Sequence, residues 1–205
     1  MLWKFFRKTG NKYGHSRISH WPPLRRASPK TNGNTYVFSH FFVFSNRGER
    51  YILWLPLDDN RLSSFPLTVT NLTELRELSI TNGNVKTIPK EISRLTKLEK
   101  LDLGNFWNYK RKNQCDSLEN LSALKNLKEL NLGWTKIRSL PPEFAMLEKL
   151  EVLNIEFNNF KRFPEVIDKI PGLKLLIISH REFNKKTMKA LRKQAKKYKI
   201  QIDMF

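Results

Sequence analysis

Cys115 is the single cysteine of this 205-residue chain and the first residue to weigh for chemistry. Three cations precede it closely, Lys110, Arg111 and Lys112. Nearby cations can lower the pKa of a thiol until it becomes a reactive thiolate. The sequence favours the plainer alternative, in which Cys115 is a loop cysteine without a reactive role.

Motifs that carry other chemistries are missing from the sequence. It contains no glycine-rich phosphate loop, no H-E-x-x-H and no C-x-x-C. One cysteine and four scattered histidines argue against a metal site built on cysteine. His180 comes near the end of a predicted strand, where a surface imidazole is the default interpretation. The sequence therefore predicts a protein that is not an enzyme, with no cofactor, no bound metal and no small-molecule substrate.

Apolar residues recur with a fixed period through most of the chain. The anchors of the period lie 23, 23, 29, 23 and 23 residues apart: Ile52, Leu75, Leu98, Leu127, Leu150 and Leu173. The positions three and five residues after every anchor are also leucine or isoleucine. This spacing predicts a short strand, because its last two members share one face. Four repeats then have a proline, which turns the chain into a helical or 3-10 return with one buried face.

The repeated pattern L-x-x-L-x-L-x-x-N-x-L-x-x-L-P resembles the leucine-rich repeat family. It is most similar to the 23-residue type of cytoplasmic bacterial and plant Ras-group-related proteins. The resemblance covers residues 51–183 and implies an α/β fold, a leucine-rich-repeat solenoid with a curved parallel β-sheet and short helical or 3-10 returns. The asparagine of the pattern is present as Asn60 and Asn158. We expect an incomplete asparagine ladder, because other residues replace it elsewhere: Gly83, Phe106, Thr135 and Arg181.

The two ends of the chain differ from the repeats in pattern and charge. Residues 184–205 predict a helix–strand cap, and residues 36–50 predict a hairpin cap around Asn46-Arg47-Gly48. Residues 1–35 are expected to be a basic, disordered arm. The net charge of +19 resides mainly in the ends, because residues 1–48 and 184–199 contain no acid. No segment approaches the ~18 apolar residues of a membrane helix. A cytoplasmic location is expected, and the acid-free N-terminus leaves organelle targeting as the alternative.

The predicted strands assign which side chains face outward on the concave surface. Positions two, four and six after the anchors supply one cation, Lys100, and several acids: Asp58, Glu77, Asp102, Glu129 and Glu156. Position seven supplies Asn82, Asn105 and a row of rings, Trp134, Phe157 and His180. Parallel strands lie ~4.8 Å apart, so these rings are expected to be neighbours. Exposed aromatics in a row are typical of interface anchors, although they can also fold back onto the repeat loops.

One repeat is six residues longer than the others, within "LGNFWNYKRKNQCDSL", residues 103–118. We expect a loop at the edge of the concave surface. Phe106 would take the buried ladder place, and Trp107 and Tyr109 would reach a partner. A passive loop is the alternative.

The sequence predicts a scaffold that binds a protein partner on the concave face and the inserted loop. Two other hypotheses are nucleic-acid or anionic-surface binding through the basic ends, and a subunit whose catalytic domain belongs to another chain.

Overall fold

The computed structural model describes residues 42–46, 49–58, 62–105, 113–115, 117–179, 183, 185–198 and 201–204. The chain divides into two compact units, Met1–Thr35 and Tyr36–Phe205. Every described residue belongs to the second unit, whose fold is built from one sheet and one row of 3-10 helices.

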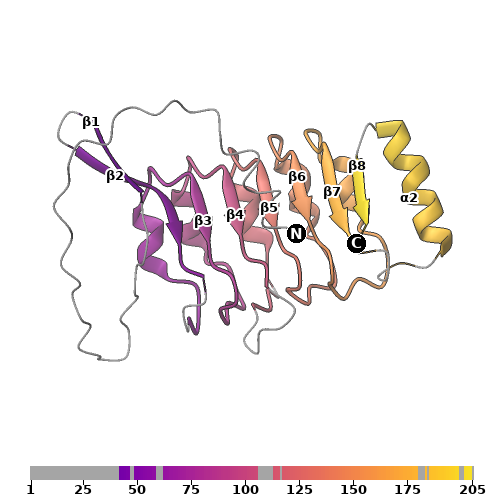
Figure 1. The fold of residues 1–205 in the computed structure, drawn as a ribbon, viewed down its shortest axis with the longest axis horizontal. Helices are drawn as coiled ribbons and strands as arrows, with labels where there is room; N and C mark the ends of the chain where they lie inside the picture. Colours follow the sequence, from indigo (N-terminus) through magenta and orange to yellow (C-terminus); the bar gives the residue numbers. More distant parts are fainter. Residues whose placement is uncertain are drawn as a thin grey trace. The chain divides into compact units, whose positions relative to one another are not determined.

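Eight described strands form this sheet, and their order in space follows their order in the chain (Figure 1). β1 and β2 pair antiparallel as a hairpin, and all later neighbours are parallel. The strands are β1 (Phe42–Asn46), β2 (Glu49–Pro56), β3 (Glu77–Ser79), β4 (Lys100–Asp102), β5 (Glu129–Asn131), β6 (Val152–Asn154), β7 (Leu175–Ile178) and β8 (Gln201–Met204). The sheet therefore contains one strand from each of the six repeats, β2 to β7, with a strand added at each end.

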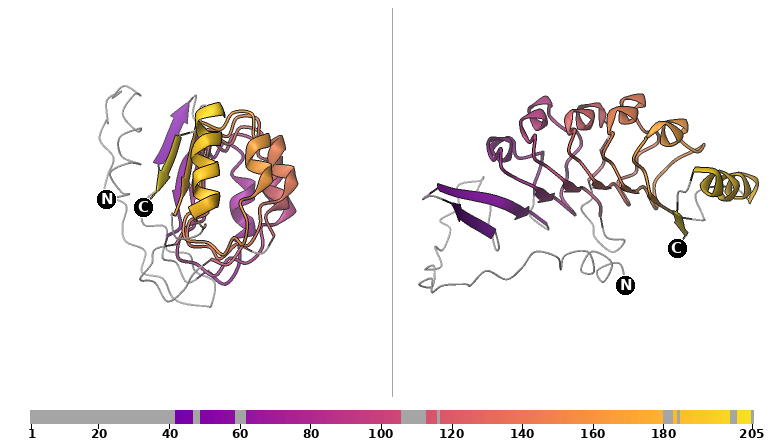
Figure 2. Two further views of the ribbon diagram at one scale, coloured as in Figure 1. Left: turned by 90° about the vertical axis from the view of Figure 1, so that its right-hand side faces the viewer. Right: turned by 90° about the horizontal axis from the view of Figure 1, so that it is seen from above.

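The 3-10 helices lie on one side of the repeats and the strands on the other (Figure 2). They are η1 (Leu67–Asn71), η2 (Lys90–Arg94), η3 (Glu119–Ala123), η4 (Pro142–Met146) and η5 (Glu165–Lys169). Four of them begin directly after a proline, and η3 begins after Leu118. Proline suits this entry because its φ is already near the helical value and its missing N–H has no partner to lose there.

The core lies between these two layers. The third residue of every 3-10 helix is buried: Val69, Ile92, Leu121, Phe144 and Ile167. The apolar positions of the period are buried as well wherever their side chains are described, with Leu173, at 6 % exposed, the most accessible. Leu55, Leu78, Leu101, Leu130, Leu153 and Leu176 are paired in register across the sheet. The predicted solenoid with a parallel sheet and 3-10 returns is confirmed.

Helix α2 (Lys185–Tyr198) and β8 close the C-terminal end of the solenoid. β8 pairs with β7 in parallel register, so the edge of the last repeat strand is covered. Met188 of α2 is buried and belongs to the same core cluster as the repeats. Lys185, Lys186, Lys189 and Lys193 are exposed on the helix, as expected for the solvated face of an amphipathic helix.

Candidate functional site

The open face of the sheet is the face turned away from the 3-10 helices. Because successive strand residues point to opposite faces, two rows of side chains cross this face between the buried leucines. The first row is Trp54, Glu77, Lys100, Glu129, Val152 and Leu175. The second row is Pro56, Ser79, Asp102, Asn131, Asn154 and Ile177.

Lys100 lies between two of the predicted contact residues. Its Nζ is 3.8 Å from Oε1 of Glu77 and 3.3 Å from Oε1 of Glu129. All three side chains are partly exposed, so each pair contributes less than about 1 kcal/mol to stability. The pairing matters more for the potential of the surface, because one cation offsets part of the charge of two acids. The open face is therefore less acidic here than a count of its carboxylates indicates.

Asp102, Asn131 and Asn154 each end a strand through the same local hydrogen bond. In each, the side-chain Oδ1 accepts a bond of 2.9 Å from the backbone N–H two residues later. Aspartate and asparagine favour this bond because their short side chains reach their own backbone. The bond ends the strand at the same position in three consecutive repeats. Asp102, a predicted contact residue, thus also shapes the edge of the sheet.

The environment of Asp102 predicts a pH-dependent stability. Burial, together with the nearby Asp58 carboxylate, raises the pKa of Asp102 to about 6, against the opposing effect of hydrogen bonds from Gly104 and Asn131. A folded-state pKa above the usual 3.8 means that protonation favours the folded protein. This contribution is fully present below about pH 4 and is lost as the pH rises through about 6. Asp102→Asn keeps the acceptor for Gly104, as Asn131 does in the next repeat. We therefore expect the variant to melt higher than the parent at neutral pH.

Thermal melts at about pH 7.5 and about pH 4 would test this expectation, because the gain should vanish where Asp102 is protonated. Glu143→Gln, which neutralises an exposed carboxylate, is the control and should melt like the parent at both values. An equal gain for Asp102→Asn at both pH values would contradict the assignment.

The structure corrects the predicted exposure of Glu156, which is only 3 % exposed. Its side chain leans over Gly133, where an added Cβ would lie 3.3 Å from Cγ of Glu156. Asn154 donates to Oε1 at 3.1 Å, while Oε2 has no hydrogen-bond partner within the described part of the chain. Burial raises the pKa of Glu156, and the Asn154 bond opposes the rise. Glu156 therefore does not offer an exposed charge to a partner.

Trp134 and Phe157 form a stacked pair at the carboxyl edge of the sheet, the edge formed by the loops that follow the strands. Their ring centroids are 4.2 Å apart and their planes differ by 22°. Both rings are partly exposed, whereas Leu132 and Ile155 nearby are fully buried. The predicted adjacency of the two rings, and their greater accessibility than that of Leu132 and Ile155, are confirmed.

The backbone at this position is left-handed in three of the four repeats where the structure describes it, Asn105 being the exception. The residue seven after the anchor has φ of 54° at Asn82, 61° at Trp134 and 54° at Phe157. Asparagine tolerates such a conformation, but bulky aromatic residues rarely adopt it. Asn82 and Asn105 are buried, at 3 % and 7 % exposed, so their predicted exposure is wrong.

Asn105 and Asn113 clamp the base of the inserted loop. The Asn105 side chain accepts a bond from the backbone N–H of Asn113 and donates to its carbonyl, at 2.8 and 3.1 Å. It also donates to the carbonyl of Trp134 at 2.9 Å. The insertion therefore starts and ends beside the aromatic pair.

Asn113 occupies the ladder place that the sequence assigns to Phe106. Asn113 bonds to the carbonyls of Ile80 and Leu103 and to the N–H of Val85. Asn158, two repeats later, makes the three equivalent bonds. They join it to the carbonyls of Leu132 and Ile155 and to the N–H of Ile137. Thr135 bridges the carbonyl of Leu132 and Oδ1 of Asn158, so the ladder is more complete than predicted.

The insertion also places Cys115 in the core rather than in a loop. Its side chain is 2 % exposed, and its Sγ lies 3.9 Å from the carbonyl oxygen of Val85. Asn113, Cys115 and Leu118 have the spacing N-x-L-x-x-L, with cysteine in the first leucine place. This spacing is the sequence signal that identifies Asn113 as the ladder residue.

The comparisons with known proteins agree with this geometry. Residues 125–183 match the leucine rich repeat family. The chain is a leucine-rich-repeat protein. A leucine-rich-repeat protein of Leptospira interrogans has a similar structure, with a TM-score of 0.60 and 28% identity over 74% of this chain and 36% of that one. The repeat ectodomain of a receptor kinase from Arabidopsis thaliana gives a TM-score of 0.50 and 26% identity, over 70% of this chain and 80% of that one.

Curated relatives match the leucine-rich-repeat protein over a small part of their own length. A probable serine/threonine-protein kinase of Dictyostelium discoideum is 32% identical over 65% of this chain and 4% of the relative. An adenylate cyclase of Schizosaccharomyces pombe is 30% identical over 71% of this chain and 8% of the relative. The chain thus spans less than a tenth of these proteins. Leucine-rich repeats typically act as protein-interaction modules, because stacked repeats form an extended concave surface.

Three predicted contact residues of the leucine-rich-repeat protein, Trp107, Tyr109 and His180, lie outside the described residues, as do Asn60 and Phe106. Within the described ranges, no three histidine, cysteine or acidic side chains come together as a metal site. The same ranges contain no helix long and apolar enough to cross a membrane.

Proposed function

We propose that this leucine-rich-repeat protein binds a protein partner through a surface centred on Trp134 and Phe157. The observation that carries the proposal is the stacked, partly exposed ring pair held in left-handed backbone. The proposal includes no catalytic step and no cofactor, and it places the protein in the cytoplasm as a scaffold.

The energetics of the pair favour a role in binding over a role in stability. A left-handed conformation costs about 1–2 kcal/mol for each residue with a side chain. A stacked aromatic pair returns only about 0.5–1.5 kcal/mol beyond its buried area. The strain of two such residues is therefore larger than what the stacking geometry adds to their buried area. Asn82 shows the tolerant residue type at the same position of another repeat. Strain of this kind is concentrated where a surface has a function.

The surroundings of the pair fit the periphery of a protein interface. Glu77, Lys100 and Glu129 form a partly exposed polar cluster on the same open face. Trp107 and Tyr109 belong to the proposed surface because the base of their loop is bonded to the backbone of Trp134 through Asn105. His180 belongs to it by its position in the repeat. In interfaces, a few aromatic anchors surrounded by polar groups supply most of the binding energy.

A Trp134→Asn, Phe157→Asn double variant tests the proposal. Asparagine keeps the left-handed backbone, as Asn82 does, and removes both rings. Partner proteins would be captured from cell extract with the parent protein and identified, and the affinity of the recovered partner would be measured by calorimetry. Each lost ring should cost about 2 kcal/mol or more of binding free energy. The melting temperature should stay the same or rise, because the strain is relieved.

The matched control is Leu67→Asn, Met146→Asn, which removes two exposed apolar side chains of the 3-10 helices, 56 % and 52 % exposed. It should bind the partner like the parent. Unchanged affinity in the Trp134, Phe157 variant would show that the pair is not the interface. A large loss of stability would place the rings in the core. If only salt-sensitive nucleic acid is captured, and it is lost when Lys185, Lys186, Lys189 and Lys193 are neutralised, the alternative through the basic ends replaces this proposal.

A further inference from the structure

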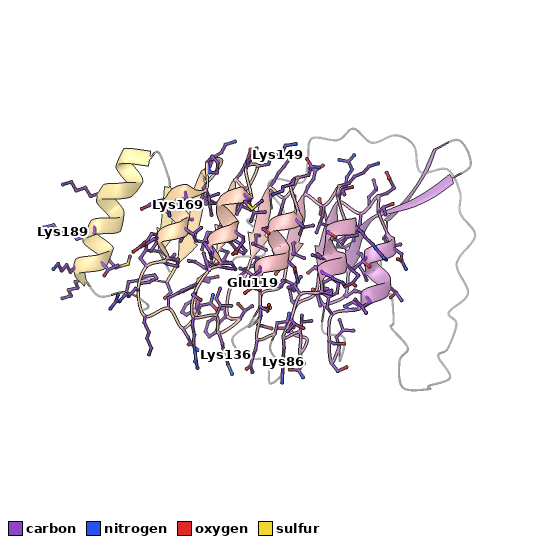
Figure 3. The ribbon with its side chains drawn as sticks, turned by 180° about the vertical axis from the view of Figure 1, so that it is seen from behind. Lys86, Glu119, Lys136, Lys149, Lys169 and Lys189 are labelled. Carbon is purple, nitrogen blue, oxygen red and sulfur yellow. The ribbon has the colours of Figure 1, made fainter. Side chains whose placement is uncertain are left out.

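The two edges of the repeat stack differ in how their charged side chains are paired. At the amino edge, before the strands, charged side chains pair with those of the neighbouring repeat: Glu74 with Lys97, Arg76 and Lys128 with Glu99, and Glu151 with Lys174. At the carboxyl edge, Lys86, Lys136, Arg138, Lys161 and Arg162 are exposed, and within the described part of the chain none has an ion-pair partner. Figure 3 shows Lys86 and Lys136 at one edge and Lys149 at the opposite edge.

The unpaired cations are aligned by the repeat. Lys86, Arg138 and Lys161 each stand eleven residues after their anchor, so they occupy equivalent places in three repeats. Lys136 stands two residues before Arg138 and has a φ of 60°, in the left-handed region that a lysine rarely adopts. Arg138 and Lys161 are therefore equivalent cations of two adjacent repeats along this edge.

Grooves lie on both sides of the segment Arg138–Pro142. The larger one, about 910 Å³, is bounded on its far side by Phe160, Lys161, Phe163 and Val166. The other, about 630 Å³, is bounded on its far side by Gln114, Leu118 and Glu119. Phe163 is partly exposed and packs edge-on against Phe183, at a centroid distance of 5.9 Å. The larger groove thus combines an apolar wall with a charged rim.

We propose that the larger groove binds an acidic peptide segment of a partner, with an apolar side chain against Phe163 and carboxylates beside Arg138, Lys161 and Arg162. Charge complementarity supports an acidic occupant. Residues 1–48 and 183–202 contain no aspartate or glutamate, so the basic ends of this chain are not that segment. Glu143 and Glu165 also border the groove region. Those acids repel a uniform polyphosphate but can be accommodated by a peptide that alternates charged and apolar residues, so a peptide fits better than a nucleic acid.

This inference goes beyond the proposed function, because it concerns a site on the other side of the same loops. The probe is a fluorescein-labelled peptide of alternating glutamate and leucine, measured by fluorescence anisotropy. At about 50 mM salt, where screening is weak, the intact chain should bind it, and binding should weaken as salt rises. A peptide with glutamine in place of glutamate should bind at least about tenfold more weakly, because it lacks the charges that pair with the rim.

Arg138→Glu, Lys161→Glu should weaken binding by about tenfold, since two attractive charges become repulsive. The matched control is Lys189→Glu, Lys193→Glu on α2, which makes the same change in net charge at two exposed positions. It should change binding less than about twofold if the rim is the site. The milder Arg138→Gln, Lys161→Gln should give an intermediate loss and keeps the test valid if charge reversal disturbs folding.

Equal losses of affinity in the rim and α2 variants would show that binding depends only on the net charge of the protein, and this would overturn the proposal. Absence of peptide binding by the parent would overturn it as well. An oligouridylate that binds more tightly than the peptide, with the same loss in the rim variant, would replace the peptide with nucleic acid. The Trp134→Asn, Phe157→Asn variant should bind the peptide like the parent. If this variant loses peptide binding, the peptide binds on the open face and the groove assignment is overturned. The proposal that Trp134 and Phe157 bind a protein partner would still stand.

Discussion

Asn113→Ala is expected to lower the free energy of unfolding by about 3 kcal/mol or more, although the residue lies at the end of an insertion. Its side chain is fully buried and bonds to Val85 N–H at 2.9 Å and to the carbonyls of Leu103 and Ile80. Alanine would leave three buried backbone groups without these bonds, and each such group costs about 1–3 kcal/mol. Urea unfolding followed by circular dichroism would measure the change.

The chain supplies both a positive and a negative control for this substitution. Asn158→Ala removes the same three bonds from another repeat and should give a loss of similar size. Gln114→Ala changes the next residue, which is partly exposed, and should stay within about 0.5 kcal/mol of the parent. If Asn113→Ala behaves like Gln114→Ala, the insertion is not anchored in the ladder, and its position beside Trp134 loses its support.

The fold is predictable because the same short pattern occurs six times. Any one strand of three residues is too short to identify, but six strands with leucine or isoleucine at equivalent places confirm one another. The 3-10 returns follow from the same repetition, since a proline and apolar residues three apart recur after the strands. The core of the regular repeats therefore follows from the period, whereas the burial of Cys115 in the long repeat does not.

The ladder residue of the long repeat was not predicted because the insertion shifts the count from the anchor. Asn113 stands fifteen residues after Leu98, whereas Asn158 stands eight residues after Leu150. A count forward from Leu98 reaches Phe106, which an asparagine ladder cannot use for backbone hydrogen bonds. The hydrogen-bonding type of the side chain, together with Cys115 and Leu118 after it, is the better guide where the chain length varies.

The site was only partly predictable. The alternation of residues along a strand predicts on which face of the sheet a side chain lies, but it does not predict whether neighbouring side chains bury it. Trp134 and Phe157 come together as their spacing predicts. Glu156 has the spacing of an outward residue but is buried, since Gly133 beside it leaves room for its side chain to lie flat. The pairing of Lys100 with Glu77 and Glu129 depends on side-chain reach across two strands. Such details depend on neighbours from other repeats, which no local pattern contains.

Removal of residues 184–205 is expected to make the protein aggregate. β7 is buried along its whole length, including Leu175 and Ile177 on the open face, and β8 covers its edge. Met188 of α2 completes the core beneath it. Loss of the cap returns several apolar side chains to water, at about 1.5–3 kcal/mol each, against a total stability of about 5–15 kcal/mol for a domain. It also exposes a parallel strand edge that can pair with another molecule. Size-exclusion chromatography and thermal melting would measure both effects.

Further variants test whether aggregation results from loss of the C-terminal cap or from truncation at either end of the chain. A chain of residues 36–205 should melt like the full protein, because the periodic apolar residues that build the core begin only at Ile52. Met188→Asp introduces a charge at a position only 8 % exposed and should lower the melting temperature, whereas Lys189→Asp on the exposed face of α2 should not. If the 36–205 chain aggregates and the 1–183 chain stays monomeric, the hairpin end depends on the first unit and the helix–strand end needs no cap. If Met188→Asp melts like Lys189→Asp, α2 does not pack on the last repeat, and β8 alone protects the edge of β7.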